Sequence, residues 1–133
     1  MNLGFFKKKK RKQEIVVESQ EIPDKEELMI KIEKAKNLLK DSNGKKRIEI
    51  LNQIGKLYFE AGEYDKAIDF YELSISENRS LGQAYTDLLK LYNLKRKEAV
   101  DHHSDSDVQL YLKKIDDLLK LSKDVIRGKV RGE

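Results

Sequence analysis

Apolar side chains recur every three or four residues through five stretches of the chain, which is the spacing of one buried face of an α-helix. The first stretch covers residues 24 to 41, and Asp24 with Glu27 forms a capping-box pattern at its start. Gly44 lies in the polar break that follows and suits a left-handed cap at the end of this helix. The inner positions predicted for the first helix are Leu28, Ile32, Ala35 and Leu39.

Two glycines mark the next part of the chain. Gly62 lies between a helix predicted over about residues 46 to 60 and another over about residues 65 to 75. Because glycine adopts the left-handed backbone of a tight turn, we expect these helices to fold back on one another as a hairpin. Gly55 lies on the inner face of the first of them, where glycine costs about 1 kcal/mol of helix propensity relative to alanine. We therefore expect another helix to cross closely there. The inner positions predicted for the pair are Leu51, Ile54, Tyr58, Ala67, Tyr71 and Ser74.

Two further stretches complete the pattern. A fourth helix follows "ENRSLGQ", with Ser80 and Gln83 as its capping pair, and a final helix follows "VDHHSDSD", with Ser106 and Gln109 in the same roles, and ends at Gly128. No stretch alternates at period two, so the sequence predicts an all-α fold. The inner positions predicted for these two helices are Ala84, Tyr85, Leu88 and Tyr92, then Val108, Tyr111, Ile115, Leu118, Ser122 and Val125.

The segment "LNQIGKLYFEAGEYDKAIDFYELSI" resembles the tetratricopeptide repeat (TPR), a helix hairpin that recurs about every 34 residues. Arg79 stands where the family usually has a closing proline, and the good match covers about residues 48 to 81. The signature positions are occupied by Leu51 in place of the usual Trp, Ile54 and Gly55 as the Leu-Gly pair, Tyr58, the turn residues Gly62 and Tyr64, and Ala67, Tyr71 and Ser74 as the small, aromatic and small positions.

A second, divergent unit follows at the same period, because "KLY" occurs at residues 56 to 58 and again at 90 to 92. The "DHHSDSD" insertion displaces the second helix of this unit, and we expect the long last helix to cap the array. The resemblance implies a short α-solenoid of antiparallel helix hairpins over residues 24 to 127. A basic tail, residues 1 to 23, is expected to be disordered, and residues 128 to 133 to form a flexible end.

Repeats of this family stack side by side and leave a groove lined mainly by the first helix of each pair. The resemblance implies that the groove binds an extended peptide or a partner helix. Lys56 and Lys90 occupy equivalent positions, which favours a polar or acidic ligand. The two-carboxylate clamp of chaperone-binding members is not reproduced, and the alternative interpretation is an ordinary solvated helix surface. Phe59 is expected either to anchor a ligand or to pack against the first helix. The groove candidates are Asn52, Lys56, Phe59, Gln83, Thr86, Lys90 and Asn93.

The composition of the chain excludes several classes of site and of protein. The chain has no cysteine, which rules out disulfides, thiolate metal sites and a cysteine nucleophile. No apolar run approaches the roughly 18 residues that span a bilayer, and "MNLGFF" precedes its lysines, the wrong order for a secretory signal. We therefore expect a cytoplasmic protein, with contact at the membrane surface as an alternative location.

Positive charge is concentrated in the N-terminal tail, because residues 1 to 23 carry six basic and three acidic side chains, or +3 of the net +4. Apolar residues beside consecutive basic ones suit docking on anionic lipid, and the same run suits binding to nucleic-acid phosphates without sequence preference. The run "KKKKRK" also resembles a nuclear import signal, and a solvated tail without a ligand is the remaining interpretation. The tail residues expected to make these contacts are Phe5, Phe6, Lys7, Lys8, Lys9, Lys10, Arg11 and Lys12.

The sequence gives little support for a metal site or a catalytic site. "DHHSDSD" offers ligand-type side chains, but adjacent histidines point in different directions and a third histidine is missing, so we expect a polar loop without a metal. No Gly-rich phosphate loop or nucleophile elbow occurs. The ligand-type residues of this loop are His102, His103, Asp105 and Asp107. On the outer face of the third helix, we expect pairing with lysines at helical spacing for the acidic residues Asp65, Asp69 and Glu72.

The sequence predicts a non-catalytic protein-binding adaptor without a cofactor. The alternative is a membrane-surface or nucleic-acid binder that acts through its tail, with the helical part as a scaffold. Self-association is a third open interpretation, since the ends of a short repeat array expose apolar surface.

Overall fold

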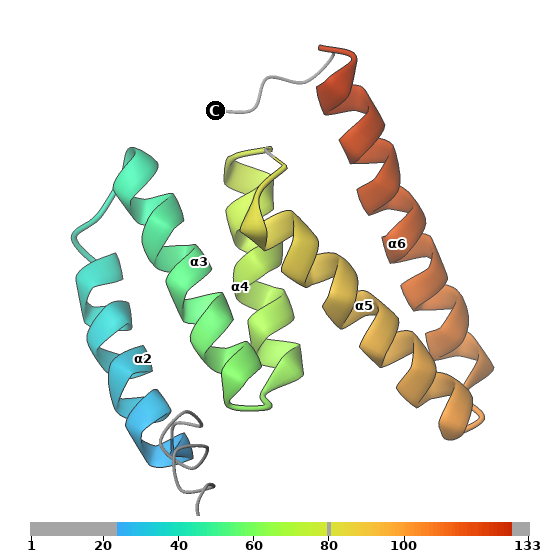
Figure 1. Cartoon of the computed structure of the whole chain (residues 1–133), viewed down its shortest axis with the longest axis horizontal. Helices are drawn as coiled ribbons and strands as arrows, with labels where there is room; N and C mark the ends of the chain where they lie inside the picture. The colour runs from blue at the N-terminus through green and yellow to red at the C-terminus, as the bar shows by residue number, and fades with distance from the viewer. Residues whose placement is uncertain (1–23, 80, 129–133) are drawn as a thin grey trace, which may run out of the picture.

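A computed structural model describes residues 24 to 79 and 81 to 128 of the chain. These residues form five helices, α2 (Lys25–Leu39), α3 (Gly44–Glu60), α4 (Tyr64–Glu77), α5 (Gln83–Asp101) and α6 (Asp105–Ile126) (Figure 1). The described part of the chain contains no strand, so the predicted all-α fold is confirmed. Among the described residues, none of the helices is both long and apolar enough to cross a membrane.

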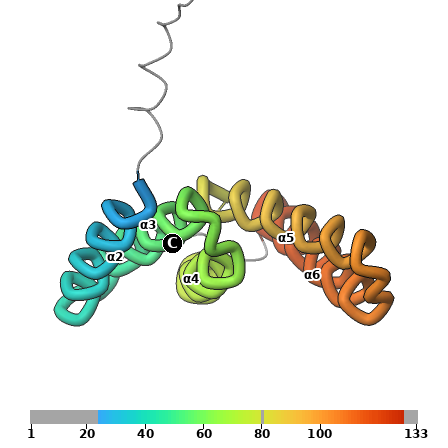
Figure 2. Tube along the Cα trace, turned by 90° about the horizontal axis from the view of Figure 1, so that it is seen from below, coloured from blue at the N-terminus to red at the C-terminus, as the bar shows by residue number. Residues whose placement is uncertain are grey.

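Each helix packs against the next one along the chain, and α3 also contacts α5. Figures 1 and 2 show α2 and α6 at opposite ends of the molecule. Figure 2 shows α3 and α5 on the same side of α4. The surface between α3 and α5 is therefore backed by α4.

The hairpin of α3 and α4 forms as its two glycines predict. Gly62 has a φ of +78°, the left-handed conformation that turns the chain between the helices. Gly55 is buried, and a β-carbon added there would lie 2.9 Å from Cε1 of Tyr71. The glycine on the inner face of α3 is thus required by the close approach of an aromatic ring from α4.

The buried core follows the predicted faces. Every inner position predicted for α3 and α4 is buried, whereas Leu39 in α2 and Tyr85 in α5 are half-buried. In α6, Leu118 is the one buried residue, and the other inner positions predicted there are half-buried. The last helix therefore covers the core less completely than the helices before it.

Helix ends follow the sequence only in part. Asp24 caps the start of α2 as predicted, and its side chain accepts a hydrogen bond from the Glu26 amide at 3.4 Å. The prediction for Gly44 was wrong: its left-handed conformation, with a φ of +58°, opens α3 instead of closing α2. Gly82 precedes α5, and the predicted cap Ser80 lies outside the described residues.

The prediction that Ser106 caps the last helix was also wrong. His103 adopts the left-handed conformation, with a φ of +56°, and the Ser104 amide donates to the carbonyl of Ala99 at 2.9 Å. This is a Schellman-type ending of α5, and it places the start of α6 at Asp105. Ser106 consequently lies inside the first turn of α6, too late to cap it.

Candidate functional site

A cavity of about 340 Å³ lies between α3 and α5. Lys56, Phe59 and Glu60 from α3 line it together with Gln83 and Asp87 from α5. Three of the predicted groove residues, Lys56, Phe59 and Gln83, therefore come together. The helices that supply them are the ones that the resemblance assigns to the first position of each hairpin.

Asp87 is the buried charge of this cavity, with only 6% of its surface exposed. One carboxylate oxygen accepts the hydroxyl of Tyr71 at 2.7 Å, and the other accepts the side-chain amide of Gln83 at 2.7 Å. Burial, followed by the hydrogen bond to Asp87, raises the pKa of Tyr71 above its usual range. Since a buried carboxylate needs such donors, these two hydrogen bonds hold the carboxylate in place at this wall of the cavity.

Phe59 is half-buried, and its ring meets the ring of Tyr64 edge-on with centroids 5.7 Å apart. The described contacts therefore give Phe59 a partner from the start of α4 while it still lines the cavity. Lys56 is exposed and makes no ion pair with any described residue. The cavity thus combines a fixed aromatic wall with a lysine that is available for a ligand.

The other predicted groove residues lie on α3 and α5 but do not line the cavity. Thr86 donates its hydroxyl to the carbonyl of Gly82, and Asn93 donates its amide to that of Leu89, so both side chains bond to their own helix. Lys90 is exposed. Asn52 is half-buried, and its Oδ1 is buried without a hydrogen bond to any described residue.

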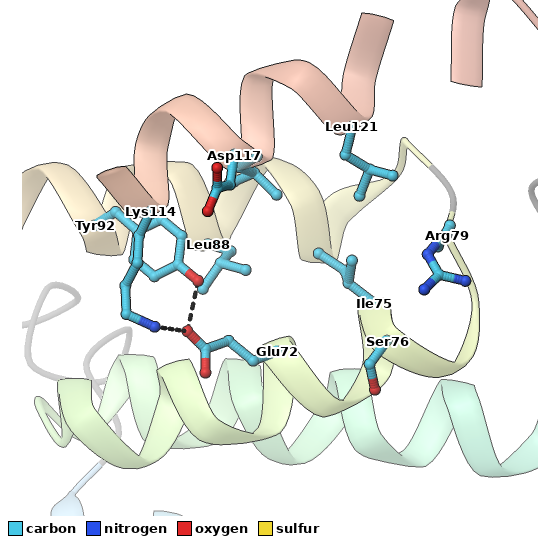
Figure 3. A pocket seen from close by; sticks show the side chains of 10 residues that line it. Glu72, Ile75, Ser76, Arg79, Leu88, Tyr92, Lys114, Asp117 and Leu121 are labelled. Atoms are coloured by element: carbon cyan, nitrogen blue, oxygen red, sulfur yellow. Dashed lines mark hydrogen bonds and ion pairs between the residues drawn. The ribbon is translucent and has the colours of Figure 1, made fainter. Parts of the chain in front are cut away.

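A second cavity, of about 270 Å³, lies where α4, α5 and α6 meet (Figure 3). At one end the Glu72 carboxylate accepts the hydroxyl of Tyr92 at 2.5 Å and the ammonium of Lys114 at 2.9 Å. The remainder is mainly apolar, with Ile75 and Leu88 among its lining residues. Glu72, Tyr92 and Lys114 satisfy one another, which indicates that this cluster joins three helices.

This cluster corrects the prediction for the acidic residues of α4. Glu72 pairs with Lys114, 42 residues away on α6, and Asp65 pairs with Lys95 on α5 at 3.0 Å. These ion pairs join different helices and are not formed at helical spacing within α4. Periodicity along one helix carries no information about which side chains a neighbouring helix brings close.

A third cavity, of about 210 Å³, lies beside the α5–α6 connection, and His102 and Asp107 are among the residues that line it. Lys95 also lines it, donates a hydrogen bond to Glu98 at 2.9 Å and forms an ion pair with Asp65. The hydrogen bond to Glu98 is the main cause that raises the pKa of Lys95. No group of three metal-ligating side chains comes together among residues 24 to 79 and 81 to 128.

Comparison with protein-family models, with curated proteins and with solved structures gives no match to this chain.

The cavity between α3 and α5 also contains residues that the sequence prediction missed. Asp87 lies three residues after Ala84 and four before Leu91, both of which are buried, so its helical position indicated the inner face. Glu60 follows the predicted Phe59 directly and adds a second carboxylate to the lining. The cavity is therefore less positive than the two lysines of the sequence suggested.

Proposed function

We propose that this protein is a non-catalytic interaction module that resembles the TPR family and binds a peptide segment between α3 and α5. The observation that carries the proposal is the cavity shared by Lys56, Phe59 and Gln83, which are three of the groove positions that the repeat pattern predicts. Repeat proteins of this type use the surface of successive first helices for binding.

The burial pattern supports the proposed repeat relationship. Residues 34 positions apart share their environment, since Ile54 and Leu88 are both buried, as are Tyr58 and Tyr92. The close contact of Gly55 with Tyr71 also pairs two signature positions of the family. α6, with 22 residues, is the longest of the described helices, in keeping with a capping role.

The side chains that line the cavity limit which kind of peptide can bind there. Lys56 offers a positive charge to a ligand carboxylate or carbonyl, and Phe59 offers an apolar surface. Glu60 and Asp87 repel a densely acidic segment, although both oxygens of Asp87 already accept hydrogen bonds. We therefore propose a peptide of mixed character that places one acidic or carbonyl group near Lys56 and an apolar side chain against Phe59.

Selection of a phage-displayed peptide library on the full chain tests this function. A selected peptide should lose about tenfold or more in affinity on Lys56→Glu, because a charge pair becomes a repulsion, and a similar amount on Phe59→Ala, because an anchor is removed. Lys34→Glu is the matched control, since Lys34 is an exposed lysine on α2. Fluorescence anisotropy gives the affinities, and thermal melting checks that each variant is folded.

Two results would contradict the proposal. One is the failure of any peptide to bind the folded chain in a concentration-dependent way. The other is a selected peptide whose affinity is the same for the wild type, Lys56→Glu and Lys34→Glu, because such a peptide binds elsewhere.

A further inference from the structure

The cavity where α4, α5 and α6 meet has a cation beside its apolar part. Arg79, which follows the end of α4, is exposed and lines the cavity. Figure 3 shows its guanidinium at the end of the cavity opposite the cluster of Glu72, Tyr92 and Lys114. The apolar lining residues are Ile75, Leu88, Leu118 and Leu121. The cavity therefore has a polar end, an apolar middle and a positive end.

Arg79 makes no ion pair within the described part of the chain. The carboxylate of Glu77, two residues earlier, instead accepts two hydrogen bonds from Arg47, at 2.8 and 3.0 Å. The other cation that lines the cavity, Lys114, donates to Glu72 at 2.9 Å. Arg79 is therefore the cation of this cavity that is left for a ligand.

The carboxylates that line the cavity already have partners. Glu72 accepts from Lys114, and Asp117 pairs with Lys113 at 3.1 Å. A cationic ligand would have to compete with a lysine, whereas an anionic ligand would meet the unpaired guanidinium of Arg79. Since a guanidinium binds a carboxylate through two parallel hydrogen bonds, and one cation balances one negative charge, the lining favours a monocarboxylate.

The volume of the cavity limits the size of this ligand. The cavity holds about 270 Å³. Because an apolar cavity of about 150 Å³ binds benzene, the same packing gives this cavity room for roughly eleven non-hydrogen atoms. A ligand of that size is a ring or a short chain that carries one carboxylate, and it is smaller than a peptide segment.

We propose that this cavity binds a small apolar monocarboxylate, with its carboxylate on Arg79 and its apolar body against Ile75 and Leu121. The ligand also meets Leu88 of α5, so it joins the last three helices in addition to the Glu72 cluster. A ligand that binds only the folded chain raises the melting temperature. The residues that line this cavity are different from those of the cavity between α3 and α5, and the proposal does not depend on peptide binding.

Titration of the isotope-labelled full chain with phenylpropanoate, followed by two-dimensional NMR, tests the site. Amide resonances near Ile75, Leu88 and Leu121 should shift in a saturable way, while those of α2 stay in place. The dissociation constant should be about 1 mM or below, as suits a ligand of this size. The matched ligands are phenylpropanol, which is neutral, and phenylpropylamine, which is a cation. Both should bind at least about fivefold more weakly, because neither offers a negative charge to Arg79.

Four variants locate the ligand. Arg79→Gln should weaken phenylpropanoate binding by about five- to tenfold and leave phenylpropanol binding unchanged. Arg127→Gln is the matched control, since Arg127 is exposed and does not line the cavity. Leu121→Trp should weaken the binding of both ligands, because the larger side chain fills the apolar part. Lys56→Glu should change neither, since Lys56 belongs to the cavity between α3 and α5. The NMR spectrum of each variant reports whether it is folded.

Several results would overturn the proposal. The first is the absence of saturable shifts at phenylpropanoate concentrations up to about 10 mM. The second is equal affinity for phenylpropanoate and phenylpropylamine, or an equal effect of Arg79→Gln and Arg127→Gln. The third is a set of shifts centred on α3 that Lys56→Glu abolishes, because the ligand would then occupy the other cavity. If Leu121→Trp does not fold, the comparison of Arg79→Gln with Arg127→Gln decides the outcome.

Discussion

Gly55 of α3 and Tyr71 of α4 approach so closely that a β-carbon on residue 55 would lie 2.9 Å from Cε1 and 3.0 Å from Cδ1 of the ring. The far end of the same ring is held by the hydrogen bond from its hydroxyl to Asp87 on α5. Tyr71 therefore connects three helices, and it cannot move away from α3 without disturbing its bond to α5.

Gly55→Ala should destabilise the fold for this reason. Alanine favours a helix by about 1 kcal/mol over glycine, but overpacking a core typically costs about 1–3 kcal/mol. We expect a net loss of about 1 kcal/mol in the free energy of unfolding, measured by urea titration. Gly82→Ala is the control, since nothing lies within 4 Å of a β-carbon there. Equal or greater stability of Gly55→Ala would show that the ring yields freely.

The contact between Gly55 and Tyr71 also shows which features of the fold can be predicted from the sequence. A glycine on the inner face of a helix signals a close neighbour because the helix would otherwise be more stable with alanine. Periodicity and turn glycines likewise predicted the helices and the hairpin, since these depend on residues close together in the chain. For the same reason, the approximate helix boundaries were within about two residues in α3 and α4.

The contacts between side chains of different helices could not be predicted from the sequence in this way. The partner of Glu72 is 42 residues away, and the two carboxylates of the candidate cavity come from different helices. Such contacts depend on how the helices cross, which the spacing within one helix does not determine. Three of the seven groove candidates line one cavity, because helical spacing correctly predicts which residues share a face of a helix. The other four lie outside it, because helical spacing does not predict where along the helices a cavity begins and ends.

Glu72→Ala should loosen the attachment of α6. The carboxylate bonds Tyr92 on α5 and Lys114 on α6, so its removal leaves a partly buried hydroxyl and an ammonium without their acceptor. We expect a loss of about 1–2 kcal/mol in the free energy of unfolding and faster amide hydrogen exchange in α6 than in α2. Asp69→Ala, which removes an exposed carboxylate one turn earlier on α4, should change neither. Uniformly faster exchange in all helices would contradict a local role for Glu72.

Alkaline pH should destabilise the protein chiefly through Tyr71 and Tyr92, whose pKa values are raised more than that of Tyr111. The pKa values of Tyr71 and Tyr92 are raised above the ordinary 10.0. The main cause is burial of the hydroxyl, and the second is its hydrogen bond to a carboxylate. Above that pH the unfolded chain loses these protons while the folded chain keeps them, so unfolding becomes more favourable as pH rises. The free energy of unfolding should fall by up to about 1.4 kcal/mol per pH unit for each tyrosine.

Urea titrations between about pH 9 and 11.5 measure this slope, on either side of the ordinary tyrosine range. Tyrosinate absorbance should show that Tyr71 and Tyr92 ionise only on unfolding. Tyr71→Phe with Tyr92→Phe should lower stability at neutral pH and flatten the alkaline slope. An unchanged slope in that double variant would assign the alkaline loss to other groups.

The N-terminal tail offers the alternative to groove binding, and it can be tested separately. The full chain should co-sediment with vesicles that contain anionic lipid, because the basic run from Lys7 to Lys12 contributes about 1 kcal/mol per side chain near such a surface. Removal of residues 1 to 12, or about 1 M salt, should abolish this binding. Vesicles of neutral lipid are the control.

Phe5 and Phe6 separate lipid from nucleic acid as the ligand of the tail. Exchange of both for serine should weaken vesicle binding, since apolar insertion is lost, and should leave binding to single-stranded RNA unchanged, since phosphate contacts depend on the basic side chains. Vesicle binding that is insensitive to both the serine exchange and the deletion would place lipid contact on the helical part of the chain. RNA binding that persists without residues 1 to 12 would likewise rule out the tail as the nucleic-acid binding site.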